Sequence, residues 1–207
     1  MSGHLQAMII LWTGVLLFPA WRLGEPRAHA ATAPAERREV RIPIEDFVLT
    51  DQHGRSFAFG RMHGKVVLVT FVYTSCPDVC PLITAAARAV QTELAPAERG
   101  AVQLLTITTD PEIDSPQTLR AYAGRYGADL TNWAFLTGDA GGLSRVWKNF
   151  GVRVRRRGRG LVDHTPLSCL VDASGVMRVA YVGASPDPRA LLRDIRGLLT
   201  GSPERAR

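Results

Sequence analysis

The chain has 207 residues, 46% of them hydrophobic, which fits one ordinary domain with a single core and excludes a collagenous or wholly disordered protein. Three cysteines are too few for a small scaffold held together by disulfides. The formal net charge is +6, but five of the 25 basic residues are arginines within residues 153–159, and the other 20 nearly balance the 19 acidic residues, so a nucleic-acid-binding protein is not expected.

The first 30 residues have the pattern of a targeting segment. Residues 7–18 are almost continuously apolar, and Ala28-His29-Ala30 resembles a cleavage site. The apolar run is shorter than the ~20 residues of a membrane span, so a cleaved signal peptide and a signal-anchor both stay open. Either predicts an exported protein, in which stable cysteine redox chemistry is permitted. The expected organisation is a targeting segment over 1–30, a linker over 31–42, one folded domain over 43–200 and a polar tail over 201–207.

Strand and helix signals alternate over the rest of the chain. The run KVVLVTFVY at 65–73 is continuously apolar and β-branched, which is typical of a strand buried on both faces. Ser115-Pro116 is a good N-cap and N1 pair for a helix that ends near Gly127. The other expected elements are a hairpin of 47–49 and 56–59, a helix from Pro81 to about Leu94, strands at 102–108, 133–136, 167–171 and 176–181, and helices at 143–150 and 188–199. This order predicts a three-layer α/β domain with a central mixed sheet flanked by helices.

Most of the chemistry-bearing residues follow the first buried strand, in the segment TSCPDVCP at 74–81. Sheets of α/β proteins bind ligands beyond the carboxyl ends of their central strands. Cys76 and Cys80 either share one face of a helical turn or lie in a tight turn that leads into a helix starting at Pro81. In both cases the sulfurs can converge, and the helix N-terminus favours thiolate. The pair is then a redox-active dithiol or half of a metal site, and the flanking prolines and Asp78 argue against two merely structural cysteines.

A metal site needs a third ligand, and His164 in LVDHTP is the best candidate. It directly precedes the expected strand at 167–171, where a loop can return to the sheet end that carries the cysteines. A lone histidine in a loop is more often a solvated polar residue. The other four histidines fit that description, because they lie in the targeting segment or in turns that contain glycine: His4, His29, His53 and His63.

The segment FVYTSCPDVCP, followed far downstream by VDHT, resembles the Sco/SenC family of copper proteins. TDPEIDSP at 109–116 is similar to the family's D-P-x-x-D-x-P stretch, and the resemblance spans about residues 45–200. It implies a thioredoxin-like fold with Cys76, Cys80 and His164 as the copper ligands. Family members are tethered in bacterial periplasms or mitochondrial intermembrane spaces, so the resemblance also implies a periplasmic location, free or anchored to the inner membrane.

Two classes of function compete. The resemblance implies an exported metallochaperone, rather than an enzyme, that delivers copper for the Cu site of cytochrome c oxidase. Thiolates select Cu(I) and imidazole remains compatible with Cu(II), so both oxidation states suit the ligand set. Expected partners are an oxidase subunit carrying a Cu site and other periplasmic copper carriers or thiol reductants, and the protein is expected to be a monomer. The alternative is a thiol–disulfide oxidoreductase that uses Cys76 and Cys80 to reduce partner cysteines, although such pairs in this fold usually have two intervening residues, not three.

Carboxylates near these residues have two interpretations each. Asp78 and Asp163 either tune the thiolates and orient the imidazole, or are solvated loop carboxylates or helix caps. Asp110, Pro111 and Asp114 are expected to form turns and caps that shape the rim of the site.

Cys169 lies inside the apolar run at 167–171 and is expected to be a core residue. The arginine run is either a solvated loop or hairpin tip, or a docking patch for an acidic partner or an anionic membrane. It consists of Arg153, Arg155, Arg156, Arg157 and Arg159.

Overall fold

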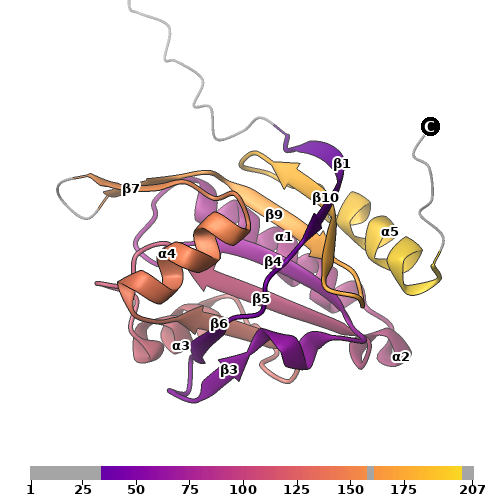
Figure 1. Cartoon of the computed structure of the whole chain (residues 1–207), viewed down its shortest axis with the longest axis horizontal. Coiled ribbons are helices and arrows are strands. Elements are labelled where there is room, and N and C mark those ends of the chain that lie inside the picture. Colours follow the sequence, from indigo (N-terminus) through magenta and orange to yellow (C-terminus); the bar gives the residue numbers. More distant parts are fainter. Residues whose placement is uncertain (1–33, 158–160, 202–207) are drawn as a thin grey trace, which may run out of the picture.

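The structure, a computed structural model, describes residues 34–157 and 161–201. Its strands are β1 (Glu36–Pro43), β2 (Val48–Asp51), β3 (Ser56–Ala58), β4 (Val66–Val72), β5 (Val102–Thr108), β6 (Trp133–Thr137), β7 (Val154–Arg157), β8 (Leu161–His164), β9 (Leu167–Val171) and β10 (Val176–Val182). Its helices are the 3-10 helix η2 (Phe59–Met62) and the α-helices α1 (Val79–Glu93), α2 (Pro96–Arg99), α3 (Pro116–Arg125), α4 (Ala140–Asn149) and α5 (Pro188–Leu199). An eight-stranded sheet has the order β1-β10-β9-β4-β5-β6-β2-β3, and β7 and β8 form a separate hairpin (Figure 1).

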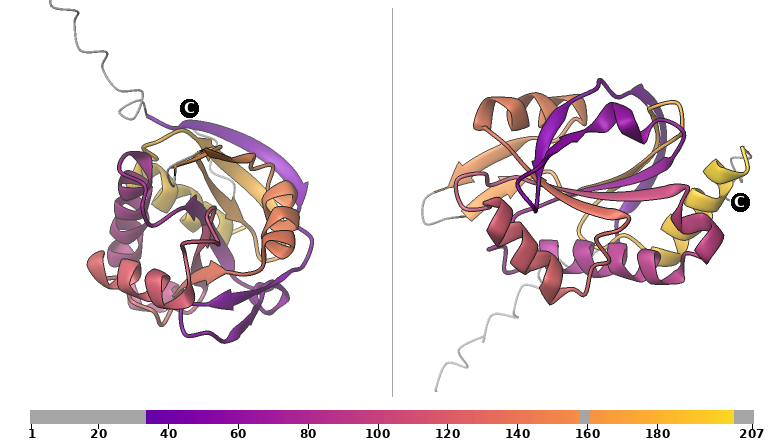
Figure 2. Two further views of the ribbon diagram at one scale, coloured as in Figure 1. Left: turned by 90° about the vertical axis from the view of Figure 1, so that its left-hand side faces the viewer. Right: turned by 90° about the horizontal axis from the view of Figure 1, so that it is seen from below.

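Helices cover both faces of the central sheet, which gives three layers. Helices α1, α3 and α5 lie on one face and α4 on the other, as the view from below shows (Figure 2). Ile83, Leu119 and Ile195 belong to the core cluster on the first face. Leu143 and Phe150 belong to a second cluster on the opposite face. The expected three-layer α/β fold with a mixed sheet is confirmed.

The three central strands β4, β5 and β6 run parallel to one another, and every residue in them is buried. Burial on both faces explains their continuous apolar runs. Parallel neighbours need a crossover connection, and α1 and α3 lie in these two connections. The first crossover begins at the carboxyl end of β4, so the segment with Cys76 and Cys80 lies beyond the carboxyl ends of the central strands.

Strand β1 is the main element that the sequence pattern did not indicate, because residues 36–42 fall within the expected linker. It pairs antiparallel with β10 at the edge of the sheet, and most of its residues are exposed. Charged side chains are typical of an edge strand, and in the sequence such a strand is hard to distinguish from a linker. Arg37 connects β1 to α5 through an ion pair with Asp194, at 2.7 Å.

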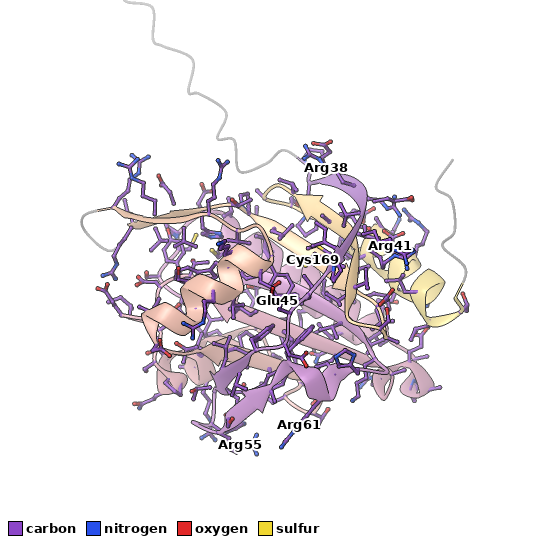
Figure 3. The ribbon with its side chains drawn as sticks, in the orientation of Figure 1. Arg38, Arg41, Glu45, Arg55, Arg61 and Cys169 are labelled. Atoms are coloured by element: carbon purple, nitrogen blue, oxygen red, sulfur yellow. The ribbon has the colours of Figure 1, made fainter. Side chains whose placement is uncertain are left out.

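Cys169 is completely buried on β9, as expected. It belongs to the core cluster on the α4 face of the sheet, whereas Cys80 belongs to the cluster on the α1 face. Figure 3 shows Cys169 in the interior, while the labelled arginines Arg38, Arg41, Arg55 and Arg61 lie at the periphery. Cys76, Cys80 and Cys169 are all free thiols.

Several sequence expectations fall outside the described residues. These are the targeting segment, the tail after Gly201, and Arg159 of the arginine run. Within the two described ranges, no helix has the length and apolar character needed to cross a bilayer.

Candidate metal centre

Cys76 lies in a turn that leads directly into α1, and Cys80 lies at the start of that helix. The helix begins at Val79, two residues before the expected start at Pro81. Pro81 therefore occupies the third helical position, where its missing N–H has no cost because the first four amides of a helix lack intrahelical acceptors. Cys80 lies in the first helical turn, whereas Cys76 precedes the helix and donates its amide to the carbonyl of Tyr73 at 3.2 Å. The structure therefore combines the two geometries considered, with Cys76 in a turn and Cys80 in the helix.

The two thiols differ in exposure and acidity. Cys76 is half-buried and Cys80 is completely buried. A hydrogen bond with the Cys80 thiol, supported by the backbone N–H groups of Cys80 and Asp78, lowers the pKa of Cys76 to about 5. The same contact, together with burial, raises the pKa of Cys80. Because two adjacent thiols cannot both ionise easily, the pair carries one thiolate at neutral pH, on Cys76.

His164 ends strand β8 and lies against Cys80. Its Nε2 is 3.7 Å from Sγ of Cys80, and its Nδ1 is 3.0 Å from the backbone carbonyl of Thr165. The carbonyl can only accept, so Nδ1 carries the hydrogen and Nε2 keeps its lone pair on the side of the cysteines. Burial lowers the pKa of His164, and the imidazole is therefore neutral at pH 7, which is the form that binds metals.

Arg156 holds the β7-β8 hairpin against the body of the domain. Alternate residues of a strand face opposite sides, and Val154 packs against the core while Arg156 reaches Asp110. Nη2 of Arg156 donates to Oδ1 of Asp110 at 2.6 Å, and the guanidinium also pairs with Glu112. Asp110 is only 1% exposed. Val154, on the same strand as Arg156, is paired with His164 in the hairpin. By holding this strand against the domain, the ion pair of Arg156 helps to position the imidazole.

Asp114 fixes the start of the cysteine loop. Its completely buried carboxylate accepts hydrogen bonds from the amide of Thr74 at 3.1 Å and from the hydroxyls of Thr74 and Thr108, both at 2.5 Å. Thr74 is two residues before Cys76, and Thr108 ends β5. The Asp-Pro stretch therefore shapes the rim of the site as expected, but through contacts with β5 and the loop after β4 rather than only through local turns.

Asp114 also predicts a pH dependence of stability. Burial raises its pKa above the ordinary value of 3.8, in spite of its hydrogen bonds. A carboxyl with a raised pKa binds its proton more tightly in the folded state, so its contribution to the free energy of unfolding is complete at low pH and falls as pH rises through the folded pKa. Asp114→Asn is expected to remove this fall. Urea denaturation of both proteins between about pH 4 and pH 7 measures it, and identical pH slopes would contradict the assignment.

Asp78 and Asp163 are both exposed, which fits their interpretation as solvated loop residues. The backbone N–H of Asp78 interacts with Cys76, and its carboxylate makes no capping hydrogen bond to α1. The carboxylate of Asp163 pairs with Arg157. The Thr165 carbonyl, not Asp163, binds Nδ1 of His164.

Tyr73 is the site residue that the sequence analysis missed. Its ring lies edge-on to the imidazole of His164 with 5.9 Å between centroids, and its hydroxyl helps to lower the pKa of Cys76. Burial raises the pKa of Tyr73 to about 12, so it remains a hydrogen-bond donor at neutral pH. In the sequence it is the last residue of an apolar run and cannot be distinguished from a core aromatic residue.

The three expected ligands are neighbours, but they are not arranged as a finished metal site. Within residues 34–157 and 161–201, no three His, Cys, Asp or Glu side chains are in place to hold an ion. Cys80 and His164 are in contact, and Cys76 interacts with Cys80. Two sulfurs and one nitrogen are a donor set that suits copper.

Comparison with known proteins agrees with the expected family. The SCO1/SenC family model matches residues 35–200. The SCO1 protein homolog of Bacillus subtilis is 30% identical over 148 residues, which cover 70% of this chain and 76% of that protein.

Two solved structures have the same thioredoxin-like fold. BsSco, a member of the Sco family of cytochrome c oxidase assembly proteins with a disulfide switch, is 28% identical with a TM-score of 0.69, over 79% of this chain and 96% of that one. Bradyrhizobium japonicum ScoI with copper bound is 28% identical with a TM-score of 0.61, over 75% of this chain and 99% of that one. Because the family match includes almost all of the described residues, this chain belongs to the SCO1/SenC family.

Proposed function

We propose that this protein is a metallochaperone that binds one copper ion through Cys76, Cys80 and His164 and delivers it for assembly of the Cu site of cytochrome c oxidase. The observation that carries the proposal is the 3.7 Å approach of the His164 Nε2 to the Cys80 Sγ, beside the Cys76 thiolate. A dithiol reductase needs no neutral imidazole at this place. Membership of the SCO1/SenC family and the copper-bound relative support the same function.

The donor set suits transport of copper rather than permanent storage. Thiolates favour Cu(I), and the imidazole makes Cu(II) acceptable as well. Three protein ligands leave the ion undersaturated, so a ligand from a partner can bind before the chaperone's own ligands leave. Cys76 is ready to coordinate at neutral pH, whereas Cys80 must release its proton when copper binds.

We further propose that the protein works in the periplasm, as a monomer. The apolar run at 7–18 and the small-residue pattern before Ala31 support export, with the folded domain either released or held near the inner membrane. The proposed partner is the oxidase subunit that carries the Cu site.

Transfer of copper to an acceptor tests this function against the reductase alternative. The copper-loaded protein is mixed with the reduced, copper-free soluble domain of an oxidase subunit that carries a Cu site. We expect the acceptor to gain its copper absorption as the donor loses copper. In a parallel reaction, the copper-free reduced protein meets the same acceptor with its cysteines oxidised to a disulfide. Reduction of that disulfide without any copper transfer in the first reaction would favour the oxidoreductase.

Arg156 offers a test of how the hairpin positions His164. Arg156→Ala is expected to leave Asp110 buried without its cation, to cost about 2–3 kcal/mol of stability and to weaken Cu(II) binding about tenfold. Arg157→Ala is the matched control, because it removes the same charge from the same strand. Its partner Asp163 is half-exposed, so this change should cost less than about 1 kcal/mol. Equal losses of Cu(II) affinity in the two variants would show that Arg156 does not position the site.

A further inference from the structure

The outer face of the β7-β8 hairpin carries positive charge that the domain itself does not use. The alternation that turns Val154 and Arg156 toward the body turns Arg155 and Arg157 away from it, and Arg153 directly precedes the strand. Arg157 pairs with Asp163. In the part of the chain that the structure describes, Arg153 and Arg155 form no ion pair, and both are exposed. The net charge of this face therefore comes from these two arginines.

A groove of about 600 Å³ joins this charge to the candidate metal centre. Arg153 and Arg155 line it together with Asp163 and His164, and Val154 and Pro166 add apolar surface. Asp163 is already paired with Arg157, so among the described residues the two arginines remain as the unpaired charges of the lining. A molecule that fills the groove therefore contacts both arginines and the imidazole at the same time. Two cations beside a partly apolar lining favour a bound molecule that has both carboxylates and apolar groups, such as an acidic peptide segment.

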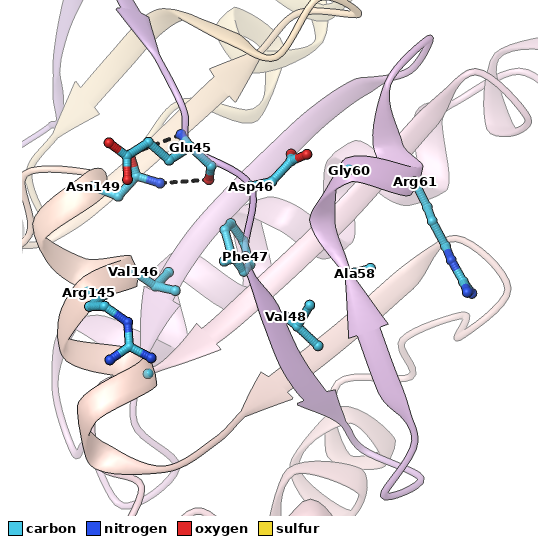
Figure 4. A pocket seen from close by; sticks show the side chains of 11 residues that line it. Glu45, Asp46, Phe47, Val48, Ala58, Gly60, Arg61, Arg145, Val146 and Asn149 are labelled. Atoms are coloured by element: carbon cyan, nitrogen blue, oxygen red, sulfur yellow. Dashed lines mark hydrogen bonds between the residues drawn. The ribbon is translucent and has the colours of Figure 1, made fainter.

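A second groove shows that open volume alone does not define such a surface. It measures about 680 Å³ and lies between η2 and α4, with Arg61 and Arg145 on opposite sides (Figure 4). Glu45 and Asp46 line the same groove, so its formal charges balance. It also includes none of the three expected copper ligands. Charge and position both single out the groove beside His164.

We propose that the groove lined by Arg153, Arg155 and His164 is the docking surface for a protein partner with an acidic contact segment. Its identity as the partner in copper exchange rests on the proposed function, whereas its preference for an acidic segment rests on the groove alone. A flat bilayer surface can reach exposed arginines but fits a concave groove poorly, so the geometry favours a protein segment. Complementary charge at this place accelerates the encounter and orients the partner toward the metal site.

Binding of a labelled hexaglutamate peptide to the copper-free, reduced full chain tests this surface by fluorescence anisotropy. The variant Arg153→Glu/Arg155→Glu is compared with Arg189→Glu/Arg193→Glu. The control reverses two exposed arginines on α5, away from the hairpin (Figure 1), and changes the net charge equally. We expect about tenfold weaker binding for the hairpin variant, or about 1.4 kcal/mol, and little change for the control. Equal weakening in both variants, or a wild type that binds hexalysine as well as hexaglutamate, would overturn the proposal.

Vesicles of neutral phosphatidylcholine mixed with anionic phosphatidylglycerol provide the second arm. We expect the hairpin variant to bind them as the control variant does. If vesicle binding falls in the hairpin variant and peptide binding does not, the surface recognises membranes and the proposal is wrong. Neither arm uses copper, so a wild type that fails to bind copper would remove the proposed function and leave the result on docking intact.

Discussion

Replacing His164 by alanine is expected to abolish Cu(II) binding and to leave weakened Cu(I) binding. The change removes the one nitrogen donor and leaves the thiols of Cys76 and Cys80. Cu(I) accepts two thiolates as its only ligands, whereas Cu(II) prefers additional nitrogen or oxygen donors in a tetragonal arrangement. The affinity for Cu(II) should therefore fall much more than the affinity for Cu(I).

The same variant separates the two classes of function. The reactivity of a dithiol depends on thiolate pKa and access, so reduction of insulin disulfides should change little in His164→Ala. Cu(II) absorption and insulin reduction are measured on both proteins, with His63→Ala as the control because His63 is a half-exposed surface histidine beside Asp46. Unchanged Cu(II) binding in His164→Ala would remove this residue from the site and favour the oxidoreductase.

Cys80→Ala is expected to abolish tight copper binding, whereas Cys169→Ala should bind as much copper as the wild type. The two thiols are well matched, because both are completely buried. They lie on opposite faces of the sheet, and only Cys80 contacts His164. Cys169→Ala removes a small core group and should cost about 1–2 kcal/mol. Copper stoichiometry by metal analysis, with urea denaturation for stability, checks both variants. Equal loss of copper would mean that Cys169 belongs to the site.

Much of the fold could be predicted because its signals are local. Strands β4 and β5 are continuous apolar runs, and Ser115 accepts a hydrogen bond from the amide of Thr118 at the start of α3, as its N-cap position predicts. The cysteine segment was placed correctly for the same reason, since it directly follows β4. His164 is 84 residues from Cys80, and its position directly before β9 singled it out as a candidate, to which the resemblance to the family added the role of copper ligand.

The parts that could not be predicted depend on contacts between distant residues. Arg156 is one of five clustered arginines, and nothing in the sequence shows that it pairs with Asp110, 46 residues away. Asp114 has the pattern of a turn residue, yet its main partner Thr74 is 40 residues distant. Strand β1 is recognised only through its pairing with β10. In each case the sequence shows polar residues that could equally lie on the surface, and the residues that they contact are known only from the fold.

A copper titration of the reduced protein tests the assignment of Cys76, Cys80 and His164 most directly. Absorption is followed in the reduced form and in the oxidised form, in which Cys76 and Cys80 are joined by a disulfide. The reduced form should bind one copper ion per chain and develop a thiolate-to-Cu(II) charge-transfer band. The oxidised form should bind none, because a disulfide has no thiolate to donate. Stoichiometric copper binding by the disulfide form would contradict the assignment of the two sulfurs as ligands.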